Sequence, residues 1–182
     1  MIARKVQEYF PNIAAGAYSY GSLTVDGVGS LHIGKFCSFS QKVALLLEGH
    51  RTDWFTTYPF PTFHEEWPSA ETFVGHPHRG KGIYIGNDVW VGWGATITDG
   101  AYIADGAVIS ANSFVTSYVK PYSVVGGNPA EFLFTRFPKE VVDLLLRLKW
   151  WDLPLSAIKE ILPTLCSSNV ERLQELVERF RP

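Results

Sequence analysis

A repeat of six residues dominates the second half of the sequence. From Ile85 the chain reads IGNDVW, VGWGAT, ITDGAY, IADGAV, ISANSF and VTSYVK, so an aliphatic residue recurs at every sixth position up to Val115. Helices repeat every 3.6 residues and strands every two, and neither period alone produces a pattern that recurs only at every sixth position. Short stacked strands joined by turns do, with the aliphatic side chain inside and a small residue where the chain bends close to itself. The repeat therefore predicts an all-β parallel β-helix.

The same repeat begins earlier in a weaker form and is then interrupted. Hexads start at Ile33, Phe39 and Leu45, after an irregular stretch in which the phase slips by two residues. The segment 49–82 then breaks the repeat completely, and it contains four prolines and four of the five histidines of the chain. A loop of this length inside a compact domain is uncommon unless it has a function. We therefore expect the chemistry of the protein in this insertion.

A helical pattern replaces the hexads near the C-terminus. After PYSVVGGNPAEF, apolar residues recur with helical spacing from Val141 to Leu148, and Pro138 suits the first position of such a helix. Two shorter helical patterns follow near 155–162 and 169–180. We expect these helices to cover the strand edges at the open end of the β-helix and to support an oligomer.

The change of period sets the domain boundaries. Residues 1–136 are expected to form the β-helix domain, which includes the inserted loop 49–82. Residues 137–182 are expected to form a C-terminal helical segment.

Composition excludes several classes of function. The formal net charge of −2 leaves no broad basic surface, so nucleic acid is not an expected partner. The N-terminal sequence MIARKVQEYF has no long apolar run, so we expect neither a signal peptide nor a membrane span and predict a cytoplasmic protein. Two cysteines do not indicate a disulfide framework. Because Cys37 falls inside a hexad, we expect it as a small residue of the core.

The order of the motifs resembles the hexapeptide acyltransferases of the xenobiotic acetyltransferase type. The hexads, the interrupting GHRTDWFTTYPF, the IGNDVWVG restart, the VVGGNPAEF exit and the KWWDL helix end follow one another in that order. The group includes chloramphenicol and streptogramin acetyltransferases and related enzymes that act on sugars. The resemblance implies a left-handed β-helix, a homotrimer, and acetyl-CoA bound in clefts between subunits. It also implies transfer of an acetyl group to a hydroxyl or amine of a small molecule.

His50 is the candidate catalytic base. Acetyl transfer requires a group that removes the acceptor proton, and histidine suits this role near neutral pH. His50 opens the GHRTDW motif beside Gly49, and Asp53 could orient its imidazole. The resembled family carries its base in this same loop motif. His76 stays an alternative, because the maltose and galactoside acetyltransferases carry their base in a GHP sequence ahead of the IG restart.

The residues after His50 are candidates for acceptor binding. Trp54 and Tyr58 would form an apolar wall that suits a flat or ring-shaped acceptor. Asp53 and Tyr58 would supply polar specificity. The second half of the insertion, FPTFHEEWPSAETF, does not decide between an antibiotic and a sugar, and we favour a sugar or another small alcohol.

Turn residues of the repeat are candidates for binding the pantetheine arm of acetyl-CoA. This arm needs turns with small side chains, and Gly94 is such a residue. By motif position, Ala111 in ISANS and Thr116 in VTS match turn residues that contact CoA in the resembled family. Trp93 occupies another such turn.

The phosphates of CoA require cations. Related sequences often carry a lysine after the VT pair, where this chain has Ser117. We therefore expect Lys120 and Arg136 to take that role.

Two other functions stay open at the level of the sequence. A zinc enzyme of the γ-carbonic anhydrase type would need three histidines around the metal, and only His50, His76 and His78 could supply them. A non-catalytic binding or assembly module would use the same fold without a base. We predict an enzyme without a metal.

Overall fold

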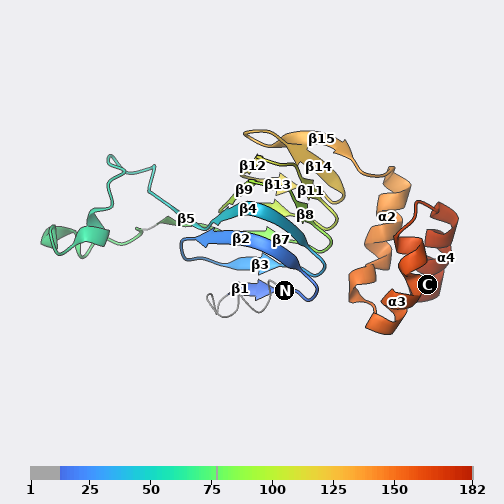
Figure 1. Ribbon diagram of the computed structural model, residues 1–182. Helices are drawn as coiled ribbons and strands as arrows, with labels where there is room; N and C mark the ends of the chain where they lie inside the picture. The colour runs from blue at the N-terminus through green and yellow to red at the C-terminus, as the bar shows by residue number, and fades with distance from the viewer. Residues whose placement is uncertain (1–12, 77, 182) are drawn as a thin grey trace.

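The computed structural model describes residues 13–76 and 78–181 (Figure 1). Short strands stack into a column, a long loop projects from one side of it, and the C-terminal helices lie at the other side. The strands are β1 (Ile13–Ala15), β2 (Tyr20–Asp26), β3 (Leu31–Ile33), β4 (Ser38–Leu46), β5 (Glu48–Gly49), β6 (His78–Arg79), β7 (Ile83–Ile85), β8 (Trp90–Val91), β9 (Thr96–Thr98), β10 (Tyr102–Ile103), β11 (Val108–Ile109), β12 (Phe114–Val115), β13 (Tyr118–Val119), β14 (Ser123–Gly126) and β15 (Glu131–Thr135). The helices are α2 (Lys139–Leu148), α3 (Leu155–Leu165) and α4 (Val170–Phe180), with short 3-10 helices η1 (Phe60–Phe63), η2 (Pro68–Ala70) and η3 (Trp150–Asp152).

The strands stack in parallel on three faces, as the hexad period requires. The first face is the stack β1, β3, β7, β10 and β13. The second face contains the start of β4 followed by β8, β11 and β14. The third face contains the end of β4 followed by β9 and β12. One coil therefore takes three hexads, and Ile85 pairs with Ile103 of the next coil.

Three corners join these faces, and each has its own surroundings. The helix corner, with Asp88 and Gly106, joins the first face to the second and lies beside the C-terminal helices. The wall corner, with Trp93 and Ala111, joins the second face to the third. The loop corner, with Gly100, joins the third face to the first, and the insertion leaves the column there.

Aliphatic residues of the hexads fill the inside of the column. Ile33, Ile85 and Ile103 stack in register and are at most 1% exposed, and burial of such side chains is the main stabilising contribution. Cys37 lies fully buried in the same core, which confirms the expectation from the repeat. The last coil is shorter than the hexads predict, because Val119 pairs with Ile103.

A strand covers the second face at the C-terminal end of the column. β15 folds back antiparallel onto β14 and covers its edge. The helices pack at the helix corner instead, where Lys35 Nζ donates hydrogen bonds to the Trp151 carbonyl oxygen at 3.3 Å and to Asp152 at 2.9 Å. Our expectation that helices cover the open strand edge was therefore wrong. The hairpin satisfies those backbone groups directly, so no helix is needed there.

The C-terminal helices form a small core of their own. Leu148 is fully buried in it, and the rings of Phe36 and Trp150, with centroids 4.7 Å apart, join this core to the column. The helices confirm the three helical patterns, with one difference at the first. Pro138 has an extended ψ of 155° and precedes α2 instead of beginning it. Among the described residues, no helix has both the length and the apolar character needed to cross a lipid bilayer.

Candidate active site

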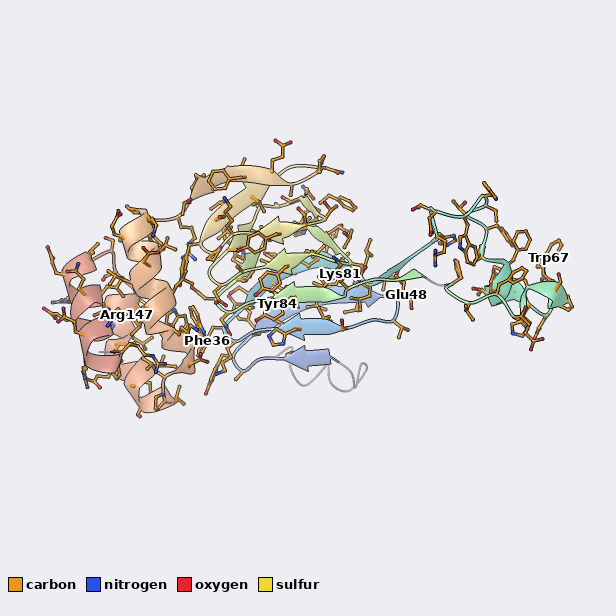
Figure 2. All side chains as sticks on the ribbon, turned by 180° about the vertical axis from the view of Figure 1, so that it is seen from behind. Phe36, Glu48, Trp67, Lys81, Tyr84 and Arg147 are labelled. Carbon is orange, nitrogen blue, oxygen red and sulfur yellow. The ribbon has the colours of Figure 1, made fainter. Side chains whose placement is uncertain are left out.

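The insertion is anchored by a short pair of strands. β5 and β6 pair antiparallel, with Glu48 opposite Arg79 and Gly49 opposite His78. Figure 2 shows Glu48 close to the column and Trp67 at the far end of the loop. Within residues 49–76, Ala70 is the one buried side chain. The insertion is therefore a projecting surface, and its anchoring strands place the start of the GHRTDW motif next to the column.

His50 follows β5 directly and is exposed. Its Nδ1 lies 2.6 Å from the carbonyl oxygen of Thr57. A carbonyl oxygen only accepts hydrogen bonds, so Nδ1 carries a proton, and in the neutral ring Nε2 is the nitrogen that keeps its lone pair. An imidazole held in this tautomer can accept a proton from an acceptor molecule. The geometry suits a general base.

His76 lies beside His50 on the returning limb of the loop. The two rings meet edge to face with centroids 5.2 Å apart. Nδ1 of His76 lies 3.2 Å from Oγ1 of Thr62, while its Nε2 is buried without a hydrogen-bond partner among the described residues. Burial of the ring, followed by the neighbouring His50, lowers the pKa of His76, and Glu48 acts in the opposite direction. The structure thus brings both candidate bases to one place.

Asp53 and Trp54 both contact Arg51. The guanidinium of Arg51 forms an ion pair with the Asp53 carboxylate, with Nε 2.6 Å from Oδ1, and lies 5.2 Å from the centroid of the Trp54 ring. The Thr57 carbonyl, not the Asp53 carboxylate, is the contact that fixes the tautomer of His50. Asp53 and Trp54 also line a hollow of about 630 Å³, together with Phe73. Both stay candidates for acceptor binding.

Tyr58 lies in an aromatic cluster of the loop. Its ring centroid is 4.7 Å from that of Phe60 and 5.8 Å from that of Phe63, and Phe60 contacts Trp67 at 5.2 Å. This packing stiffens the tip of the insertion. Tyr58 itself remains 45% exposed and stays a candidate for acceptor binding.

Trp93, Gly94 and Ala111 come together at the wall corner. The turns stack closely there, since the backbone N–H of Asn112 donates to the Trp93 carbonyl oxygen at 2.8 Å. Gly94 has a φ of +67°, which favours glycine. Lys42 Nζ lies 4.7 Å from the centroid of the Trp93 ring and adds a cation to this surface. The corner offers backbone groups and an aromatic face along the side of the column.

The other candidates for CoA binding lie at different corners of the same chain. Thr116 follows β12 and lies at the loop corner. Lys120 follows β13 and is exposed at the helix corner. Arg136 lies at the helix corner as well, where it donates to the Gly106 carbonyl oxygen at 2.7 Å. Within a single chain, Lys120 and Arg136 therefore do not lie beside Trp93.

The described residues contain no assembled metal site. Among the side chains that the structure describes, no three of His, Cys, Asp or Glu are grouped so that they could hold a metal ion. The side chain of His78, which the zinc hypothesis requires, lies outside the described part.

Two contacts of the site have no distinctive sequence signal. The Thr57 carbonyl orients His50, but every residue carries a carbonyl, so sequence does not single this one out. Thr62 reaches His76 across fourteen positions of the chain. Only the fold of the insertion brings these groups together.

Solved structures identify the class of fold. The chain superposes on a maltose O-acetyltransferase from Clostridium difficile 630 with a TM-score of 0.53 and 25% identity, over 70% of this chain and 60% of that one. A hexapeptide-repeat-containing acetyltransferase from Vibrio cholerae gives a TM-score of 0.54 and 23% identity, over 70% and 64%. The same type of protein from Vibrio cholerae O1 biovar eltor was solved in complex with acetyl coenzyme A. This chain spans less than two thirds of these proteins. It has the fold of the hexapeptide-repeat acetyltransferases.

Sequence relatives narrow the class to a family. The chain is 40% identical to a chloramphenicol acetyltransferase from Escherichia coli, over 90% of this chain and 86% of that protein. It is 40% identical to the virginiamycin A acetyltransferase of Staphylococcus aureus, over 90% and 81%. It is 41% identical to a probable macrolide acetyltransferase from Lysinibacillus sphaericus, over 82% and 83%. The chain therefore belongs to the family of the chloramphenicol and virginiamycin acetyltransferases and is an acyltransferase. No family model matches the sequence.

Proposed function

We propose that the chain transfers an acetyl group from acetyl-CoA to a hydroxyl group of an antibiotic-type molecule, with His50 as general base. The observation that carries the proposal is the contact between His50 Nδ1 and the Thr57 carbonyl oxygen, which leaves Nε2 free to take a proton. The names of the relatives, which specify chloramphenicol, virginiamycin A and macrolides, favour an antibiotic over the sugar that we preferred from the sequence.

The proposed reaction needs one proton transfer in each direction. His50 Nε2 takes the proton of the acceptor hydroxyl while its oxygen attacks the thioester carbonyl carbon. The carbon–sulfur bond then breaks, and the imidazolium returns the proton to the thiolate of CoA. The acceptor leaves as an acetyl ester. The Thr57 carbonyl stabilises the imidazolium through Nδ1–H and holds the ring in place.

We propose that acetyl-CoA runs along the wall corner. Trp93 and Ala111 are exposed there and Gly94 is half-buried, so the corner offers an open surface. Since Lys120 and Arg136 lie at another corner of the same chain, a cleft between two subunits would be needed to bring these cations to the same ligand. This requirement supports the homotrimer implied by the resemblance. The same proposal includes a left-handed β-helix, a domain boundary between residues 136 and 137, and a cytoplasmic location.

The exposed apolar surface of the insertion also supports assembly. Phe55, Phe73 and Val74 are exposed at 114%, 57% and 86% on a loop that projects from the column. A projecting surface of this kind is typical of a protein contact. We propose that the insertion packs against a neighbouring subunit and that the acceptor binds between them. Light scattering should give three times the chain mass of 20.4 kDa.

An acceptor screen tests the proposed function. The protein is incubated with acetyl-CoA and chloramphenicol, virginiamycin A, a macrolide or maltose, and free thiol is measured. We expect thiol release well above the acceptor-free rate with at least one antibiotic and not with maltose. Calorimetric binding of acetyl-CoA without thiol release for any acceptor would instead favour the non-catalytic module.

A further inference from the structure

A cavity of about 520 Å³ lies between the C-terminal helices and the helix corner of the column. Its walls are mainly apolar and come from all three helices, with polar side chains from the connection between α3 and α4 and from the helix corner. They are formed by Val141 and Leu145 of α2, Ile158 and Leu162 of α3, and Leu173 of α4. Figure 1 shows these helices on the side of the column away from the insertion, so the cavity is separate from the His50 site. Volumes of this size are typical of small-molecule sites.

One buried polar group at the column side of this cavity lacks a partner. Tyr122 lines the cavity and is 1% exposed, yet its hydroxyl has no hydrogen-bond partner among the described residues. Its ring packs against that of Phe137, with centroids 6.0 Å apart. Buried hydroxyls are nearly always paired, because an unpaired one loses the hydrogen bonds it had in water. A ligand oxygen at this end of the cavity would restore the missing bond.

The charges beside Tyr122 balance each other. The Asp88 carboxylate and the Arg136 guanidinium both line the cavity, and Oδ2 of Asp88 lies 3.9 Å from Nη1 of Arg136. Arg136 also donates to the Gly106 carbonyl oxygen and lies over the Tyr122 ring at 5.4 Å. A charged ligand would leave one of these groups without compensation in a partly buried place. A neutral polar group fits this end best.

We propose that this cavity binds a small neutral molecule with an apolar body of about two rings and one hydroxyl group, whose oxygen pairs with the Tyr122 hydroxyl. The apolar body lies between α2 and α3, and the hydroxyl points toward the column. The site shares Arg136 with the cations proposed for the CoA phosphates, but it uses none of the residues assigned to proton transfer, so binding at this cavity can be tested separately from the proposed reaction.

A matched pair of probes tests the proposal. 2-Naphthol carries the required hydroxyl, and 2-methylnaphthalene has nearly the same shape without it. Titration of the full-length protein, followed by calorimetry or fluorescence, should show saturable binding of one molecule per chain. We expect 2-naphthol to bind about 5- to 10-fold more tightly than 2-methylnaphthalene, which is the effect of one hydrogen bond.

Two variants locate the bound probe. Tyr122→Phe removes only the buried hydroxyl and should abolish or reverse the preference for 2-naphthol, because the hydroxyl of the probe is then left without a partner. Leu162→Trp fills the cavity from an exposed position of α3 and should abolish saturable binding of both probes. Thermal unfolding of each variant shows that the fold is retained.

Cys166 gives an independent readout at the cavity. It lines the cavity and is exposed, whereas Cys37 is buried and burial raises the pKa of its thiol to about 11. Iodoacetamide should therefore alkylate Cys166 selectively, and bound 2-naphthol should slow that reaction. Absence of saturable binding, equal affinity of the two probes for the unsubstituted protein, or unchanged discrimination in Tyr122→Phe would each overturn the proposal.

Discussion

The two histidines of the insertion have different surroundings, and this difference assigns them different roles. His50 is exposed and has its Nδ1 held by a backbone oxygen. The Nε2 of His76 is buried, and the ring lies against His50 and Thr62. A base must reach its substrate, so the exposed ring is the better candidate. His76 is placed to support the ring of His50.

Replacement of His50 by alanine should remove most of the transferase activity without loss of acetyl-CoA affinity. A positioned base contributes about 10²- to 10⁴-fold to the rate, so kcat should fall by that factor. Steady-state thiol release and calorimetry measure the two effects. His64→Ala is the matched control, because His64 is an exposed histidine of the same loop, and its activity should stay near the original value. A larger loss in His76→Ala than in His50→Ala would reverse the assignment.

The surroundings of the Asp88 carboxylate disfavour its charged form. Burial raises its pKa from 3.8 to about 6, since Arg136 only partly offsets the desolvation and Asp105 adds repulsion. The folded protein therefore binds a proton here more tightly than the unfolded chain does. Between about pH 4 and 6 the free energy of unfolding falls as pH rises, and above that range the loss is complete.

Asp88→Asn should remove this dependence on pH. We expect the variant to gain roughly 1–2 kcal/mol relative to the original protein as the pH rises from 4 to 7, a value reduced for the solvent that reaches the side chain. Urea unfolding at several pH values measures the difference. Parallel stability curves for the two proteins would show that Asp88 is not the titrating group.

At the scale of single elements, the coils stack too closely for a side chain at certain turns. A Cβ atom added to Gly34 would lie 2.4 Å from the carbonyl oxygen of Gly86 in the next coil. That neighbour is backbone, so the coils would have to move apart. The small residues after the hexad aliphatics thus reflect the spacing between coils.

Gly34→Ala should destabilise the column, and Gly49→Ala should not. The overpacked variant is expected to lose roughly 1–3 kcal/mol, or several degrees in Tm for a chain of this size. Gly49 is the matched control, because a Cβ atom there meets nothing within 4 Å. Thermal unfolding followed by circular dichroism compares the two. Equal changes in Tm would show that coil spacing is not limiting at Gly34.

The hexads predicted the elements that depend on local period. The phase of Ile85 and Ile103 defines which side chains point inward, so the stacked faces and the core follow from the sequence. The positions that depend on distant contacts did not follow from it. The helices pack beside Lys35 and not over the end of the column, because β15 already covers that edge. The hydrogen-bond partner of His50 could not be predicted from the sequence, because the contact is made by a backbone carbonyl group, which every residue carries.

At the scale of the whole molecule, the insertion and the column contribute separately to the stability of the protein. The column has a continuous buried core, whereas the described loop residues 49–76 bury only Ala70. The loop is held by β5 and β6 and by contacts within itself. Its stability is therefore expected to be lower than that of the column.

Excision of residues 54–74, replaced by a short Gly-Ser linker, should leave the column folded. Because the loop buries little apolar surface within its own chain and a shorter loop costs less entropy to close, the column of a single chain should keep its Tm within a few degrees, although the subunit contact proposed for the insertion is lost. Transferase activity should disappear, since Thr57 and the acceptor wall are removed. Circular dichroism, thermal unfolding and thiol release test these effects. A cooperative loss of the β-sheet signal at room temperature would show that the insertion belongs to the folding unit.

The two-residue anchor of the insertion has a consequence for how such proteins diversify. β5 and β6 fasten both limbs of the loop at one corner, and few side chains of the loop enter the core. Substitutions and insertions in segment 49–82 are therefore expected to cost little stability. Each coil residue, in contrast, is constrained by the coils above and below it. Descendants of one scaffold can thus acquire new acceptors by altering a single stretch of the gene, while the rest of the coding sequence changes slowly.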